Sequence, residues 1–157
     1  MGAFATIMLA GLLTAIPQSD EAPARLVDAV SLLRQSAAGV QVALGPPVRS
    51  RAVPAGDFQL PMGGYSRVYQ RHDATIDVDF AAERSTTVRV SFLDSAAAPQ
   101  TYEAALAAVG LRSDVPPDLV RRSFHEWHSL DGYVVQVVAD PRAHHIDAVV
   151  LSLSSTP

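Results

Sequence analysis

The chain has 157 residues, a formal net charge of -4 and no cysteine. This length suits one domain, and apolar residues at 48% against charged residues at 18% are typical of a chain that folds on its own. The lack of basic runs argues against a nucleic-acid partner, and the lack of cysteine excludes disulfides, thiolate zinc sites and cysteine nucleophiles. All 12 basic residues are arginines, which excludes a P-loop or Schiff-base lysine.

The chain begins with an apolar segment. Residues 3–16 carry no charge, and this length is typical of the hydrophobic region of an export signal and short for a membrane span, although no Lys or Arg precedes it. We interpret residues 1–18 as an export-signal-like segment before a single α+β domain over residues 19–157. The mature protein is then expected to begin between Ala15 and Glu21, in the periplasm or outside the cell. A buried helix in a cytoplasmic protein is the alternative.

The domain is expected to open with a helix. Ser19 or Asp20 is a suitable N-cap, and apolar residues then recur at helical spacing up to Gly39. The next run, residues 39–47, fits either a short second helix or an extended segment. Residues 46–64 are rich in Pro and Gly and show neither period, which predicts a loop.

Alternation of apolar and polar residues predicts three strands, at residues 65–70, 75–80 and 86–92. The last two strands carry Ile, Val and Phe on one face and Thr, Asp, Arg and Ser on the other. Such strands form a half-buried antiparallel meander. The other predicted elements are a helix over residues 100–109 and strands over residues 122–129, 133–139 and 145–153.

The predicted order is therefore helix, three strands, helix, three strands. It favours an α+β fold with an antiparallel sheet of about six strands in two meanders and helices packed on one face. In topology alone, this order resembles the tandem helix-and-meander arrangement of β-lactamase-inhibitor-like and small envelope-protein domains, and cystatin-like or NTF2-like folds are the alternatives. No residue motif carries this resemblance, so no functional residue is transferred from it.

No catalytic motif is recognisable in the sequence, which lacks the G-x-S-x-G, S-x-x-K and G-x-G-x-x-G patterns. Asp77 and Asp79 share one face of a predicted strand, which makes them a candidate pair of catalytic carboxylates. Because they alternate with apolar residues, we interpret them as part of a solvated outer face. We predict neither a catalytic residue nor a cofactor.

Four histidines form the one cluster that is worth testing as a metal site: His125, His128, His144 and His145. His125 and His128 are three residues apart, so in a strand their side chains point to opposite faces. The adjacent pair His144 and His145 diverges in the same way. We therefore expect surface and turn histidines, and no tight structural metal.

The weak candidates for binding are aromatic residues and arginines. Tyr65, Arg67 and Tyr69 alternate along one predicted strand, Arg89 lies on the polar face of another, and Trp127 is the only tryptophan. These residue types are enriched at binding hot spots, and Arg can stack on aromatic rings. The alternative is that the tyrosines pack in the core.

Two functions are compatible with these features. The favoured one is an exported, non-enzymatic binding or interaction module that uses the polar face of its sheet, with another envelope or extracellular protein as partner. The alternative is a small enzyme or ligand carrier with a pocket between sheet and helices, assisted by its histidines. The two differ in whether polar groups converge in a concavity or spread over an open sheet. We expect no membrane span after removal of the signal.

Overall fold

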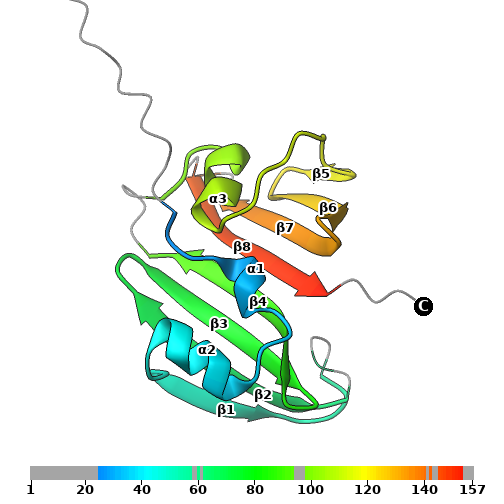
Figure 1. The fold of residues 1–157 in the computed structure, drawn as a ribbon. Helices are drawn as coiled ribbons and strands as arrows, with labels where there is room; N and C mark the ends of the chain where they lie inside the picture. Colours follow the sequence, from blue (N-terminus) through cyan, green and yellow to red (C-terminus); the bar gives the residue numbers. More distant parts are fainter. Residues whose placement is uncertain are drawn as a thin grey trace, which may run out of the picture.

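The structure is a computed structural model that describes residues 25–57, 60, 62–93, 98–140, 142 and 145–153. Its helices are α1 (Ala29–Leu32), α2 (Ala37–Leu44) and α3 (Tyr102–Ala108). Its strands are β1 (Arg49–Val53), β2 (Gly64–Arg71), β3 (Ala74–Ala81), β4 (Arg84–Phe92), β5 (Leu119–Arg121), β6 (Phe124–Leu130), β7 (Tyr133–Asp140) and β8 (His145–Leu153) (Figure 1). Among these residues, no helix has the length and apolar character that crossing a membrane requires.

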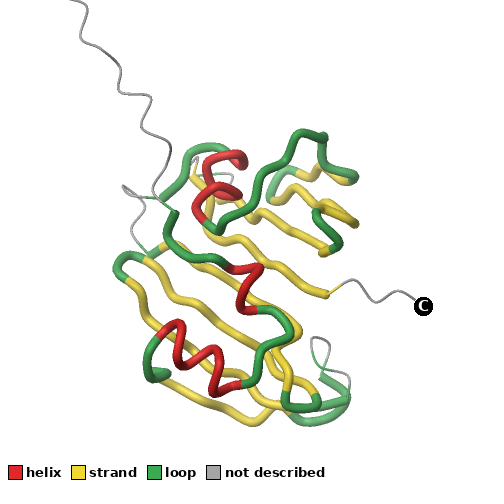
Figure 2. The backbone as a smooth tube through the Cα atoms, in the orientation of Figure 1, coloured by secondary structure: helices red, strands yellow, loops and turns green. Residues whose placement is uncertain are grey.

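The strands form one eight-stranded antiparallel sheet in the order β1-β2-β3-β4-β8-β7-β6-β5. Two runs of four consecutive strands meet where β4 pairs with β8, in the middle of the sheet. The helices are few and short beside this sheet (Figure 2). The prediction of about six strands in two meanders, with helices packed on one face, was therefore wrong.

The two strands absent from the prediction are the outermost ones, β1 and β5. In β1 the first four residues are all exposed and only Val53 is buried. β5 has three residues and follows a Pro-rich segment. An edge strand that is exposed on both faces has no apolar alternation, so the sequence gives no period-2 signal for it.

Within the described residues, the helix expected to reach Gly39 is interrupted after α1, and its expected cap at Ser19 or Asp20 lies outside them. α2 covers most of the run at residues 39–47 that fitted either a short helix or an extended segment. The chain is extended at Leu33 and adopts a left-handed conformation at Arg34, before Ser36 caps α2. The buried hydroxyl of Ser85, on β4, accepts a hydrogen bond from the backbone N–H of Gln35 at 2.9 Å. The break between the helices is thus fixed by a residue that lies 50 positions away in the sequence.

The core lies between the helices and one face of the sheet. Its centre consists of aliphatic residues from the four central strands, all at most 2% exposed: Ile76, Val78, Val88, Val90, Val135, Val137, Val149 and Leu151. Complete burial of each such side chain stabilises the fold by about 1.5–3 kcal/mol. α1 packs against β4, α2 against β2, and α3 against β7 and β8.

The registers of the two halves of the sheet correspond. Tyr69 on β2 and Trp127 on β6 each lie opposite a buried aliphatic residue of the next strand, and both side chains are buried. Arg67 and His125 occupy the equivalent positions two residues earlier. The covering helices differ, because α2 packs against β2 whereas α3 packs against β7 and β8. This difference leaves space beside β6.

Candidate functional site

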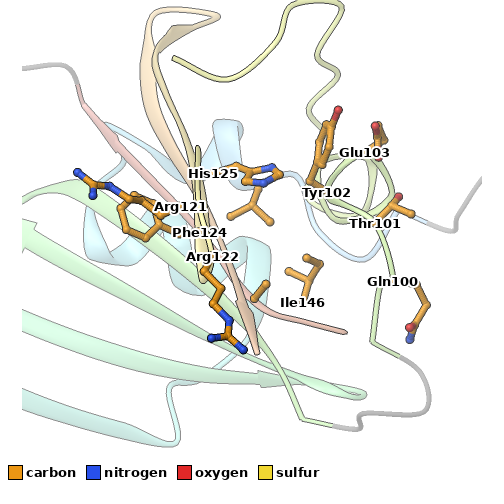
Figure 3. A pocket seen from close by; sticks show the side chains of 11 residues that line it. Gln100, Thr101, Tyr102, Glu103, Arg121, Arg122, Phe124, His125 and Ile146 are labelled. Atoms are coloured by element: carbon orange, nitrogen blue, oxygen red, sulfur yellow. The ribbon is translucent and has the colours of Figure 1, made fainter. Parts of the chain in front are cut away.

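A cavity of about 340 Å³ lies between the start of α3 and strands β6 and β7 (Figure 3). Its floor is apolar and consists of Val137, Ala139 and Ile146. The volume is at the low end of the range for small-molecule pockets, and an apolar floor with a few polar groups around it is typical of such sites.

The start of α3 forms one wall of the cavity. Thr101 caps this helix by accepting a hydrogen bond from the Ala104 N–H at 3.2 Å. Glu103 follows in the first turn, where hydrogen bonds from its own backbone N–H, and then from the hydroxyl groups of Tyr102 and Thr101, lower the pKa of its carboxyl. The same contact with Glu103 raises the pKa of Tyr102. Glu103 is therefore ionised at neutral pH and already has hydrogen-bond donors in the protein.

An aromatic cluster continues this wall toward β6. The ring centroid of Tyr102 lies 5.0 Å from that of His125 and 5.8 Å from that of Trp127. The Trp127 indole N–H donates to the Val115 carbonyl at 3.1 Å, which meets the one polar requirement of that buried ring. In contrast, Nδ1 of His125 is buried and has no hydrogen-bond partner within the described residues. A polar atom with unused hydrogen-bonding capacity therefore lies beside the cavity.

The β5–β6 hairpin forms the opposite wall and supplies its cation. Arg121 is paired with Phe124 across the hairpin. Arg121 and Arg122 both line the cavity, and Figure 3 shows their guanidinium groups pointing in different directions, that of Arg121 away from His125 and Ile146. Arg122 is exposed and makes no ion pair or hydrogen bond with another described residue. Its guanidinium is thus available to a ligand.

The five residues proposed for binding do not form one surface. Tyr65, Arg67 and Tyr69 share one face of β2, as expected. This face is the core side of the sheet, because their cross-strand partners are the buried residues Phe80, Val78 and Ile76. Tyr69 and Trp127 are buried, so neither offers a contact surface. Arg89 is exposed on the other side of the sheet.

Tyr65 and Arg67 line a second, more open cavity of about 410 Å³. The Tyr65 ring stacks on Phe80 at a centroid distance of 4.9 Å, and the Arg67 guanidinium carbon lies 5.5 Å from the Tyr65 centroid. The Tyr65 hydroxyl donates to the Glu83 carboxylate at 3.3 Å. Desolvation, and then the charge of Glu83, raises the pKa of Tyr65. These groups contact one another, which leaves less binding capacity than in the cavity beside α3.

The polar face of the sheet carries paired groups that are spread along several strands. Arg89 lies opposite Asp77. The Ser66 hydroxyl donates to the Asp77 carboxylate at 2.9 Å. Asp79 differs from the expected solvated outer face because it is only 8% exposed, and this burial raises the pKa of its carboxyl.

Two of the four histidines proposed as metal ligands pair with carboxylates. His128 Nε2 lies 2.8 Å from the Glu126 carboxylate, and His145 Nε2 lies 3.0 Å from that of Asp147. His144 lies outside the described residues. Within the ranges that the structure describes, no group of three or more His, Cys, Asp or Glu side chains could hold a metal ion.

Sequence reasoning missed most of the cavity. His125 was considered only as a metal ligand, and Tyr102 only as part of a helix face. Arg122 and Ile146 were not singled out at all. No local pattern could have identified them, because the cavity joins residues from four separate segments, at 100–103, 121–125, 137–139 and 146.

The fold is similar to those of two solved structures. One is an extracellular protein containing an SCP domain from Bacillus anthracis, with 12% sequence identity and a TM-score of 0.53 over 95% of this chain and 51% of that chain. The other is a cysteine-rich secretory protein from Staphylococcus aureus, with 10% identity and a TM-score of 0.51 over 78% of this chain and 45% of that chain. This chain thus spans about half the length of the structures that it matches.

The chain matches no family model and no curated protein sequence. At these identities, the likeness establishes the fold alone. The class that fold and site define is a mostly β domain with one eight-stranded antiparallel sheet, few short helices and a small cavity beside one of them.

Proposed function

We propose that this protein is an exported binding module that takes a small molecule into the cavity between α3 and strands β6 and β7. The observation that carries the proposal is the composition of the cavity, an apolar floor flanked by Arg122, His125 and Glu103 from two separate segments. Convergence of a few polar groups on an apolar concavity is the usual design of a ligand site. The apolar N-terminal run supports export, as do the two similar structures, which are described as extracellular and secretory proteins.

The cavity is a better candidate than the polar face of the sheet, the surface favoured by the sequence. On that face Arg89 lies opposite Asp77, which also accepts a hydrogen bond from Ser66. A partner would have to compete with these contacts. In the cavity, the guanidinium of Arg122 has no such competing group among the described residues.

Two substitutions on β7 test the proposal. The probe is N-phenyl-1-naphthylamine, an uncharged dye that fluoresces in apolar surroundings. Ala139 lines the cavity, so Ala139→Phe should fill the floor and weaken dye binding tenfold or more, a loss of about 1.4 kcal/mol or more. Val134 lies on the other face of β7, across from Ser152 and outside the cavity lining, so Val134→Phe should bind the dye as the wild type does.

Thermal melts of both variants show whether the fold is retained. If Ala139→Phe does not fold, Ala139→Leu fills the floor with a smaller side chain. The proposal is wrong if the wild-type protein does not bind the dye, or if a folded Ala139 variant binds it as tightly as the Val134→Phe control.

A further inference from the structure

We infer that the ligand of this cavity is a small monoanion with an apolar body, held with its anionic group at Arg122. The inference rests on the proposed function and specifies the chemical class of ligand. It follows from three features of the cavity: the distribution of its charges, the composition of its floor and its size.

The charged groups on the cavity walls differ in whether they already have a partner in the protein. The Glu103 carboxylate is hydrogen-bonded by the Tyr102 hydroxyl, and this contact contributes to its low pKa. Arg122, on the opposite wall, has no carboxylate partner among the described residues. A planar guanidinium with free donors binds carboxylate or sulfonate oxygens through two parallel hydrogen bonds. The free charge of the cavity is therefore positive.

The negative charge of Glu103 limits how much anionic charge the cavity accepts. Because Glu103 is ionised at neutral pH, a second negative charge on the ligand would be repelled by a carboxylate on the wall of the same cavity. This disfavours dianions such as phosphate monoesters. A carboxylate or sulfonate fits better, and Glu103 orients it by disfavouring the reversed pose.

The remainder of the cavity selects an apolar body of limited length. Val137, Ala139 and Ile146 present no polar side-chain atom to the ligand, and the rings of His125 and Tyr102 extend the apolar surface. A volume of about 340 Å³ suits two or three rings or a short alkyl chain rather than a long lipid. The unpartnered Nδ1 of His125 offers one further polar contact beside this body.

A pair of dyes separates the ligand class from the proposed function itself. 1-Anilinonaphthalene-8-sulfonate has the same aromatic skeleton as N-phenyl-1-naphthylamine but carries one negative charge. The wild-type protein should bind the sulfonate about tenfold more tightly than the uncharged dye. Added salt should weaken binding of the sulfonate and leave that of the uncharged dye unchanged.

Two exposed arginines provide the matched variants. Arg122→Ala should weaken binding of the sulfonate about tenfold and leave the uncharged dye unaffected. Arg89→Ala removes the same charge from the other face of the sheet, outside the cavity lining, so it should bind both dyes as the wild type does. Thermal melts confirm folding, which these exposed positions should tolerate.

Each contrary result has a separate meaning. If both dyes bind equally well, or if Arg122→Ala and Arg89→Ala have equal effects on the sulfonate, the anionic ligand class is wrong and the binding module stands. If neither dye binds to the wild-type protein, the proposed function itself fails.

Discussion

Adjacent residues on β4 face opposite sides of the sheet, and substitution costs should differ accordingly. Val90 is fully buried opposite Ile76, whereas Arg89 is exposed opposite Asp77. Val90→Ala should lower the free energy of unfolding by about 1–3 kcal/mol through lost apolar burial. Arg89→Ala should lower it by about 0.2–1 kcal/mol, because an exposed cross-strand ion pair is weak. Urea unfolding of both variants measures the difference, and the reverse order would mean that the two faces are exchanged.

The buried carboxyl of Asp79 should affect how stability depends on pH. Desolvation raises the pKa of Asp79 above its ordinary value of 3.8, and the nearby Ser66 hydroxyl opposes this only in part. As the pH rises through that ordinary value, the unfolded chain loses the proton first, so stability falls until the folded state also ionises. Above both pKa values the cost is constant.

Asp79→Asn should therefore be more stable than the wild type at neutral pH. Its advantage should shrink as the pH falls below the ordinary pKa of an aspartate, where Asp79 is neutral in both states. Thermal melts of the two proteins across the acidic range measure this. An advantage that does not change with pH would show that the charge of Asp79 is not the cause.

The same residue shows what a local pattern can and cannot predict. Alternation with Ile76, Val78 and Phe80 correctly places Asp77 and Asp79 on the face away from the core. It does not predict that Asp79 is buried there, because burial depends on neighbours from distant segments, and Ser66 of β2 is one of them.

At the level of elements, periodicity located the strands that have one buried face. The predicted strands at residues 65–70, 75–80 and 86–92 correspond to β2, β3 and β4, and those in the second half correspond to β6, β7 and β8. The predicted helix over residues 100–109 corresponds to α3. Each of these strands alternates because the core covers one of its faces.

The remaining elements depend on contacts that the local sequence does not encode. β1 and β5 exist because β2 and β6 provide a hydrogen-bonding edge, whatever the apolar pattern of their own residues. The break between α1 and α2 is fixed by Ser85, whose hydroxyl donates to the Leu32 carbonyl at 2.5 Å and accepts from Gln35 at 2.9 Å. Helical spacing alone extended a single helix through this break.

At the level of the whole molecule, the cavity results from a difference between two similar halves. Tyr69 and Trp127 occupy equivalent positions, but the segments that cover them differ: α2 packs against β2, while Trp127 contacts Val115 of the segment after α3. The sequence predicted that a pocket between sheet and helices was one possible site. It did not predict its place, because that place depends on which strands the helix of each half covers.

The central claim is that a small ligand binds in the cavity beside α3. Amide chemical shifts of isotope-labelled protein, recorded while 1-anilinonaphthalene-8-sulfonate is added, test it residue by residue. The largest changes in amide chemical shift should occur around the cavity, at Thr101, His125, Val137 and Ile146. Largest shifts at Thr87 and Arg89, on the opposite face of the sheet, would contradict it and return the binding surface to the polar face.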